Sequence, residues 1–192
     1  MLSPCLKSPQ LAAFADFWYA LRATLESPLP SYKDFPLETL AHFLPCLAIT
    51  RRRDNGMPYY HFYGTELAHA LGEDATGKDV FSNMTEEAQA QYMQLINKAA
   101  AKEKQDGSLN GRWFLCQVMT KDKRLVEVEG LTLPFTADGG EIRRATYSAV
   151  LGSVALGDAQ GAPYAQPKGT EFDAFSKRPD WMFLQNASAA AE

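Results

Sequence analysis

The stretch from residue 59 to residue 81 constrains the fold of this chain more than any other part of the sequence. It opens with five consecutive aromatic or imidazole residues, which favour a half-buried β-strand. Gly64 ends this run, and Thr65 after it can cap a helix. Two more glycines follow, Gly72 and Gly77. Because glycine suits the left-handed residue that ends a helix, the stretch predicts a strand, a short helix and a tight turn.

The neighbouring segments predict an antiparallel sheet around this stretch. The sequence Asp54-Asn55-Gly56 favours a hairpin turn, so Leu47–Arg52 should pair with residues 59–63. Three later segments have strand composition and are separated by turn residues: 112–120, 125–134 and 142–151. A helix with one apolar stripe is expected between the two groups of strands, at residues 85–104. This order of elements indicates an α+β domain.

Residues 8–25 carry apolar side chains at three- and four-residue steps, which predicts an amphipathic helix. Its apolar face is rich in aromatic residues and includes Phe14, Phe17, Trp18 and Leu21. Two partners could bury this face: the chain's own sheet, or a second copy of the chain. The second alternative predicts a homodimer. A proline-containing connector and a short helix at residues 37–44 then lead into the first strand.

Two motifs carry a resemblance to a known family. The first follows the second predicted strand and consists of Gly64, Thr65, Gly72, Thr76, Gly77 and Val80. The second lies in the fourth predicted strand and consists of Glu129, Gly130, Leu131, Leu133 and Pro134. Over residues 14–151 the chain resembles the PAS sensor-domain family, most closely a bacterial branch of it. The resemblance implies a five-stranded antiparallel sheet with short helices on one face and an N-terminal helix.

These segments divide the chain into an N-terminal helix (1–27), a PAS-like domain (28–152) and a linker with a C-terminal extension (153–192). The segment 170–184 is rich in aromatic residues, and it either folds back on the domain or docks on another chain. Folding back is favoured, because an exposed run of this kind promotes aggregation.

The fourth predicted strand carries two further expectations. Its apolar alternation changes parity near Gly130, which predicts a β-bulge at that residue. Glu127 and Glu129 alternate with Val126 and Val128, so both carboxylates are expected on a solvated face of the strand.

Composition and charge exclude several classes of protein. Hydrophobic residues make up 46% of the chain and charged residues 22%, values typical of a globular protein. The net charge is −4 and the basic run Arg51-Arg52-Arg53 is short, so no nucleic-acid partner is expected. The chain has neither a secretory signal nor an apolar run long enough to cross a membrane, which favours the cytoplasm. The three cysteines, Cys5, Cys46 and Cys116, are expected to be reduced, and no metal site is expected.

The resemblance implies a stand-alone sensory or adaptor module that binds a small apolar molecule, a signalling protein or both. Its pocket would lie between the sheet and the short helices, lined by Tyr60, Phe62, Leu67, Leu71, Phe81 and Leu131, together with Trp113 or Phe114. No cofactor is expected. His42 and His69 are the candidates for a haem ligand, but His69 falls near the wet side of its helix. Neither Cys46 nor Cys116 stands where flavin sensors of this family carry their reactive cysteine.

A small α+β enzyme or a ligand carrier with a similar strand order is the alternative. It would use His61 or His42 as a general base beside Asp34 or Asp79. Strand alternation turns His61 away from the expected pocket, and the local spacing assembles no catalytic triad. The sequence therefore favours a protein without enzymatic activity.

Overall fold

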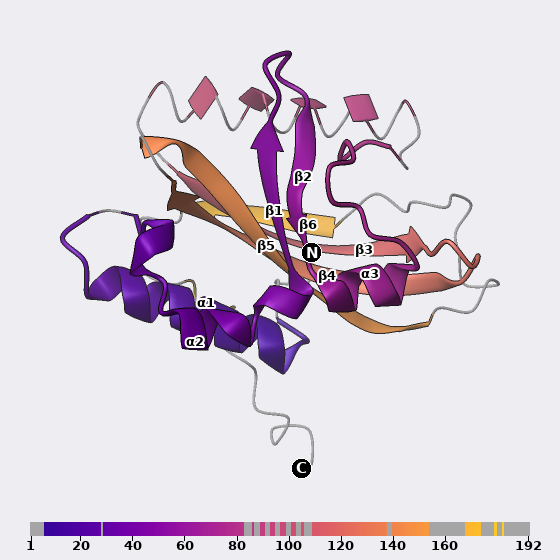
Figure 1. Cartoon of the computed structure of the whole chain (residues 1–192), viewed down its shortest axis with the longest axis horizontal. Helices are drawn as coiled ribbons and strands as arrows, with labels where there is room; N and C mark the ends of the chain where they lie inside the picture. The colour runs from indigo at the N-terminus through magenta and orange to yellow at the C-terminus, as the bar shows by residue number, and fades with distance from the viewer. Residues whose placement is uncertain are drawn as a thin grey trace, which may run out of the picture.

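A single antiparallel sheet organises the structure (Figure 1). The computed structural model describes residues 6–27, 29–82, 109–137, 140–153 and 168–173, with single positions between 86 and 105 and at 179 and 182. The strands occur in the order β2-β1-β5-β4-β3-β6. Their bounds are Leu47–Arg52 (β1), Pro58–Tyr63 (β2), Asn110–Met119 (β3), Leu125–Thr136 (β4), Ile142–Ser153 (β5) and Lys168–Asp173 (β6). The five strands and the α+β class expected from the sequence are confirmed, and β6 adds a sixth strand.

The helices precede or interrupt the strands in the chain. The α-helices are α1 (Pro9–Ala23), α2 (Leu37–Ala41) and α3 (Thr65–Leu71), and the 3-10 turns are η1 (Tyr32–Asp34) and η2 (Leu44–Cys46). In Figure 1, α1 and α2 lie on one side of the β1–β2 hairpin and α3 lies on the other. The expected helix at residues 85–104 lies mostly outside the described residues, although the described positions within it are helical.

Local sequence explains where α1 and α3 begin and end. Ser8 caps α1, since its hydroxyl accepts a hydrogen bond from the backbone of Leu11, and Pro9 occupies the first turn. Gly72 ends α3 in the left-handed conformation, at φ 83°. Gly64 is needed for another reason: a Cβ at this position would overlap the backbone of Leu44 and Pro45. The glycine therefore lets η2 pass directly against the start of α3.

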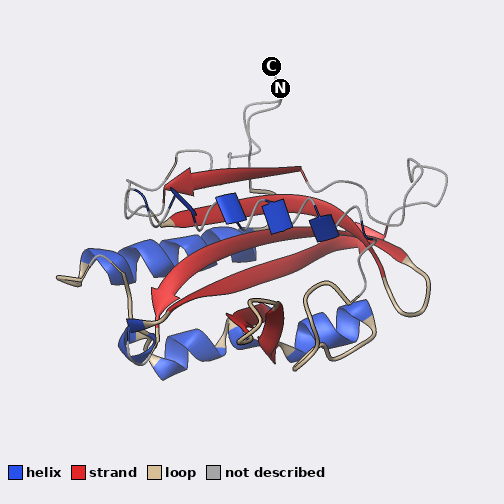
Figure 2. Ribbon diagram, turned by 90° about the horizontal axis from the view of Figure 1, so that it is seen from above, coloured by secondary structure: helices blue, strands red, loops and turns tan. Residues whose placement is uncertain are grey.

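The sheet has two covered faces. Paired residues of neighbouring antiparallel strands project to the same face, so the strand register assigns each side chain to one of them. The face covered by α1, called here the α1 face, carries a buried cluster that includes Leu47, Tyr147, Leu131, Leu133 and Trp113. The other side, called here the opposite face, carries Ala48, Val126, Val128, Phe114 and Gly130. Figure 2 shows the curved sheet with helices running along it.

Aromatic packing holds α1 on its face. The ring of Phe14 stacks on Tyr147 at a centroid distance of 5.3 Å and meets Phe43 edge-on at 5.4 Å. The indole of Trp18 donates a hydrogen bond of 3.0 Å to the carbonyl of Pro134 in β4. Phe14 and Trp18 are each only 1% exposed, so the chain's own sheet buries the aromatic face of α1.

Gly130 has a packing role in place of the predicted β-bulge. Both the β3–β4 and the β4–β5 registers run through Gly130 without a shift, and the irregularity lies between Glu127 and Val128 in the β4–β5 pairing. The prediction of a bulge at Gly130 was therefore wrong. A Cβ at Gly130 would overlap the ring of Phe114, which lies across from it on β3. The glycine creates the space into which this ring packs.

A register shift in the β1–β2 hairpin has a consequence for the predicted pocket. Phe62 pairs with Ile49, whereas Tyr60 pairs with Thr50, so one extra residue of β2 lies between these pairs. Tyr60 and Phe62 therefore project to opposite faces of the sheet, although strict alternation would place them on the same face. The ring of Tyr60 instead meets that of Tyr63 at 5.0 Å.

Both edge strands of the five-stranded core, β2 and β3, form hydrogen bonds with a further segment of the chain. Beside β2, the segment 77–80 forms hydrogen bonds with Pro58 and Tyr60. Beside β3, β6 pairs antiparallel along six residue pairs, from Asn110 with Asp173 to Leu115 with Lys168. This part of the C-terminal extension thus folds back on the domain, as the sequence favours. The rest of the segment 170–184 lies outside the described residues, except for Pro179 and the fully buried Met182.

Candidate functional site

The eight residues predicted to line a ligand pocket do not lie around one cavity. Three belong to or pack against the buried cluster of the α1 face: Phe62, Trp113 and Leu131. Two strand residues project to the opposite face: Tyr60 and Phe114. The other three come from α3 and the segment after it: Leu67, Leu71 and Phe81. The sheet separates the first group from the second, so these residues cannot surround a single ligand.

The residues predicted to form a dimer interface are divided between core and surface. Phe14 and Trp18 are buried in the chain's own core, which makes them unavailable to a second copy. Phe17 is half-buried and packs on Phe43 at 5.3 Å, and Leu21 is also half-buried. The part of the prediction that used Phe14 and Trp18 as contact residues is therefore corrected by the burial of both side chains.

Glu129 is a fully buried carboxylate, contrary to the expectation of a solvated strand face. Its Oε1 accepts hydrogen bonds from the backbone N–H of Lys7 at 3.0 Å and from the indole of Trp113 at 2.9 Å. Its Oε2 accepts from the backbone N–H groups of Lys7 at 3.1 Å and Ser8 at 2.8 Å. The neighbouring Glu127 is partly exposed and pairs with the ammonium of Lys7 at 3.2 Å. Four hydrogen bonds offset the cost of burying the Glu129 charge.

These contacts identify Glu129 as an anchor that joins three segments. It fixes the chain just before α1 to the middle of β4 and also orients Trp113 of β3. All its described hydrogen-bond partners are groups of the chain itself. The only hint in the sequence was that this glutamate lies in a nearly continuous apolar strand.

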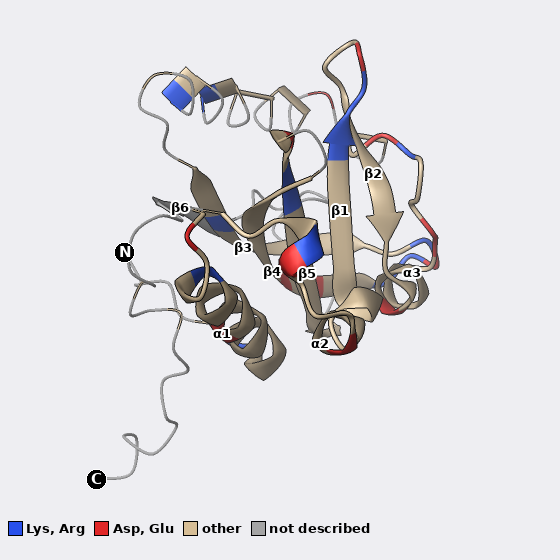
Figure 3. Ribbon diagram, turned by 60° about the vertical axis from the view of Figure 1, so that its left-hand side comes forward, with Lys and Arg blue, Asp and Glu red and all other residues tan. Residues whose placement is uncertain are grey.

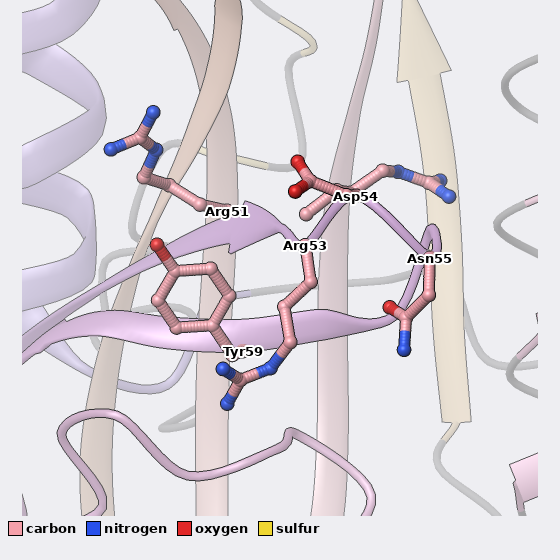
Figure 4. A pocket seen from close by; sticks show the side chains of 6 residues that line it. Arg51, Arg53, Asp54, Asn55 and Tyr59 are labelled. Carbon is pink, nitrogen blue, oxygen red and sulfur yellow. The ribbon is translucent and has the colours of Figure 1, made fainter.

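An arginine-rich region surrounds the tip of the β1–β2 hairpin (Figure 3). A surface hollow of about 550 Å³ is lined there by Arg51, Arg52, Arg53, Asp54, Asn55 and Tyr59. The hollow is shallow and widely open to solvent, and its lining is mostly polar. Figure 4 shows the hydroxyl of Tyr59 directed towards the Arg51 side chain, with Arg53 at the other end of the ring.

Two of these arginines have distinct partners. The guanidinium of Arg53 lies 4.6 Å from the centre of the Tyr59 ring and also binds Asp79 at 3.0 Å and the carbonyl of Gly77 at 2.8 Å. Arg51 makes one long contact, from Nη2 to Oε2 of Glu141 at 3.4 Å. Its Nε is buried, and no group in the described part of the chain accepts a hydrogen bond from it.

Glu141 brings a second arginine close to Arg51. The same Oε2 atom accepts hydrogen bonds from Nε and Nη2 of Arg143 at 3.1 and 2.9 Å. The hydrogen bond from Arg143 is the main factor that lowers the pKa of Glu141, and the charge of Arg51 adds to it. Two guanidinium groups therefore share a single carboxylate oxygen, at a position where the Glu141 side chain is 42% exposed.

His61 is next to this group of charges. Its ring meets that of Tyr59 edge-on, at a centroid distance of 6.3 Å. Desolvation lowers the pKa of His61, and the positive charges of Arg51 and Arg143 lower it further, while Glu141 acts in the opposite direction. His61 is therefore predominantly neutral at pH 7.

The histidines do not form the arrangement that the enzyme alternative requires. His61 and His42 are exposed and do not line the described hollow. Asp34 accepts a hydrogen bond from the backbone of Ser31, and Asp79 pairs with Arg53. The described residues thus bring neither histidine together with its expected aspartate. His69, the other haem candidate, is also exposed, and the described part of the chain has no cluster of metal-ligating side chains.

The described cysteines are poor nucleophiles. Burial raises the pKa of Cys116 to about 11, and it also raises the pKa of Cys46. A thiol with a raised pKa carries little thiolate at neutral pH. The third cysteine, Cys5, lies outside the described residues.

The fold defines an α+β domain in which α1 packs on one face of an antiparallel sheet, and the sequence comparison then gives its family. The sequence model of the PAS domain matches residues 6–150. The chain belongs to the PAS domain family. No match was found among curated proteins. Within the described residues, no helix is both long and apolar enough to span a bilayer.

Proposed function

We propose that this PAS protein is a cytoplasmic sensory or adaptor module of the bacterial branch. It binds a small apolar molecule, a protein partner or both, and it transmits the bound state by contact. Membership of the PAS family, whose domains sense signals and mediate interactions, supports the general class.

The burial of the opposite face is the observation that best supports a binding role. Val126 and Val128 are only 3% and 4% exposed there, although α1 covers the other face. Leu67, Val80 and Phe81, from the connection between β2 and β3, are also buried. The apolar side chains of this connection can change their packing without disturbing the α1 core. This is what a sensor needs if ligand binding is to alter its structure locally.

Native mass spectrometry of the full chain tests the small-molecule role. The expected result is a mass above that of the denatured chain, or saturable uptake from a panel of small apolar compounds. Val128→Phe, which fills space on the opposite face, should abolish uptake. Leu133→Phe enlarges a buried side chain on the α1 face and serves as the control.

The possible outcomes separate the two roles. If the native protein neither retains nor takes up a small molecule, the small-molecule role is wrong and the adaptor role remains. Equal loss of uptake in both variants would show that the opposite face is not the binding layer.

The proposal includes a homodimer, whose interface is the exposed surface of η1 and α2. Leu37 is 76% exposed and Tyr32 is 41% exposed, on elements adjacent to α1 in the chain. Light scattering at micromolar concentration should give twice the chain mass of 21.3 kDa, and Leu37→Glu should shift the equilibrium towards the monomer. A wild-type protein that is monomeric at this concentration would contradict the dimer.

A further inference from the structure

We propose that Arg51 and Arg143 form a binding site for an oxyanion group, a phosphate or a carboxylate of a small molecule, and that Glu141 occupies this site as an internal competitor. The site is distinct from the apolar layer of the opposite face. Its success or failure is therefore independent of the proposed sensory function.

The geometry of the two arginines supports this assignment. Three N–H groups of Arg51 and Arg143 converge on one oxygen of Glu141, at 2.9 to 3.4 Å. Arginine recognises carboxylates and phosphates by such convergent N–H groups. The two side chains are thus already positioned around an oxyanion, and the carboxylate that occupies the position belongs to an exposed residue.

The charge balance leaves this position incompletely neutralised. Glu141 supplies one negative charge to two guanidinium groups, and its contact with Arg51 is the longest of the three, at 3.4 Å. In addition, the buried Nε of Arg51 has no acceptor among the described residues. A buried donor without an acceptor carries a desolvation cost, which adds to the incomplete neutralisation of Arg51.

The neighbouring hollow provides space for the rest of such a molecule. Arg51 and Tyr59 both line it, and the Tyr59 hydroxyl is directed towards Arg51 (Figure 4). The hollow is open to solvent, so an organic group attached to the oxyanion would lie against its surface beside Tyr59. Arg52 also lines the hollow, but its only described hydrogen bond goes to the carbonyl of Gly56 at 3.3 Å.

Nuclear magnetic resonance of the isotope-labelled full chain tests the proposal. Inorganic phosphate, phenyl phosphate and benzoate are each titrated at constant ionic strength, so that general screening does not contribute. The expected result is saturable shifts at Arg51, Tyr59 and Arg143. The pKa of His61 should rise as each probe saturates, because a bound anion offsets the positive charges of Arg51 and Arg143.

Removing an arginine of the site and removing its carboxylate should have opposite effects on binding. Arg51→Gln and Arg143→Gln should each weaken binding at least about tenfold, the effect of losing a hydrogen bond to a charged group. Glu141→Gln removes the competing charge and should tighten binding several-fold. Arg124→Gln makes the same change of charge in the β3–β4 turn, outside the site, and should leave the affinity within about twofold.

The probes also identify the ligand class. Tighter binding of phenyl phosphate than of benzoate assigns the site to phosphate esters, and the reverse order assigns it to carboxylates. Tighter binding of inorganic phosphate than of phenyl phosphate would assign it to the free ion.

The proposal is overturned if the shifts are linear in probe concentration. It is also overturned if Arg124→Gln weakens binding as much as Arg51→Gln, or if Glu141→Gln leaves the affinity unchanged. Thermal unfolding of each variant verifies that it is folded, and Arg143→Gln provides the test if Arg51→Gln is not.

Discussion

Glu129 and Glu141 are two carboxylates that each accept several hydrogen bonds, in very different surroundings. Glu129 is fully buried, and its described donors are backbone N–H groups and an indole, which are fixed by the fold. Glu141 is exposed to solvent, and its donors are the guanidinium groups of two arginine side chains. The difference indicates that Glu129 is an integral part of the structure, whereas an external anion can replace Glu141.

Removal of Glu129 should have the largest effect on stability. Glu129→Ala leaves the N–H groups of Lys7, Ser8 and Trp113 without their acceptor, and each buried donor of this kind costs about 1–3 kcal/mol. We expect the free energy of unfolding to fall by about 4 kcal/mol in chemical denaturation.

Glu127→Ala is the matched control for this variant, since Glu127 also contacts Lys7 but through an exposed ion pair. Its expected cost is below about 1 kcal/mol. Equal effects of the two substitutions would contradict the assignment of Glu129 as the anchor.

A change next to Glu129 should have an intermediate effect. In Gly130→Ala the added methyl group would overlap the ring of Phe114, and relief of such overpacking costs about 1–3 kcal/mol. The denaturation midpoint should fall accordingly. The double variant Gly130→Ala with Phe114→Leu should recover part of the loss, and no recovery would mean that the ring is not the cause.

Glu141→Gln should change stability by less than about 1 kcal/mol, because the ion pairs of Glu141 are exposed. The pKa of Glu141 is lowered in the folded state, so its contribution is present above the ordinary glutamate pKa and is lost as pH falls through the folded value. Denaturation of wild type and variant at neutral and at acidic pH measures this. A difference that grows as the pH falls would contradict the sign.

The smallest effect concerns the titration of His61. Because Arg51 contributes to its lowered pKa, Arg51→Gln should raise the pKa measured from the imidazole proton resonances. Arg124→Gln, which removes a charge from the β3–β4 turn, should not. A lowered histidine pKa means that any stabilisation is lost as pH falls from the ordinary histidine value towards the folded one. A pKa that does not respond to Arg51→Gln would separate His61 from the arginine pair.

Sequence patterns were informative where each segment has one exposed and one buried side. Local turn chemistry predicts the hairpin at Asp54-Asn55-Gly56, and periodicity predicts the amphipathic α1. The order of the five core strands along the chain follows from the same two signals. In β4 the contrast between an exposed and a buried side is missing. Val126 and Val128 are buried on one face, and Leu131 and Leu133 are buried on the other. Alternation therefore could not show that Glu129 is buried.

The predicted pocket shows a second limit. Strict alternation predicts Tyr60 and Phe62 on the same face of the sheet. They lie on different faces, because one extra residue in β2 reverses the face of every residue beyond it. The choice between Trp113 and Phe114 depends on the strand register, which local sequence does not specify. The convergence of Arg51 and Arg143 on Glu141 was also missed, since β1 and β5 become neighbours only in the folded sheet.

The distance along the chain between Lys7 and Glu129 has a consequence for protein synthesis. The two residues are 122 positions apart, and Trp18 is 116 positions from its partner Pro134. A ribosome that adds 5–20 residues per second needs roughly 6–25 s to make the intervening chain. During that time α1 has emerged but the strand that receives its aromatic face has not been made. Helix α1 is thus translated well before it can be buried, and nascent chains must keep its apolar face from aggregating until β4 emerges.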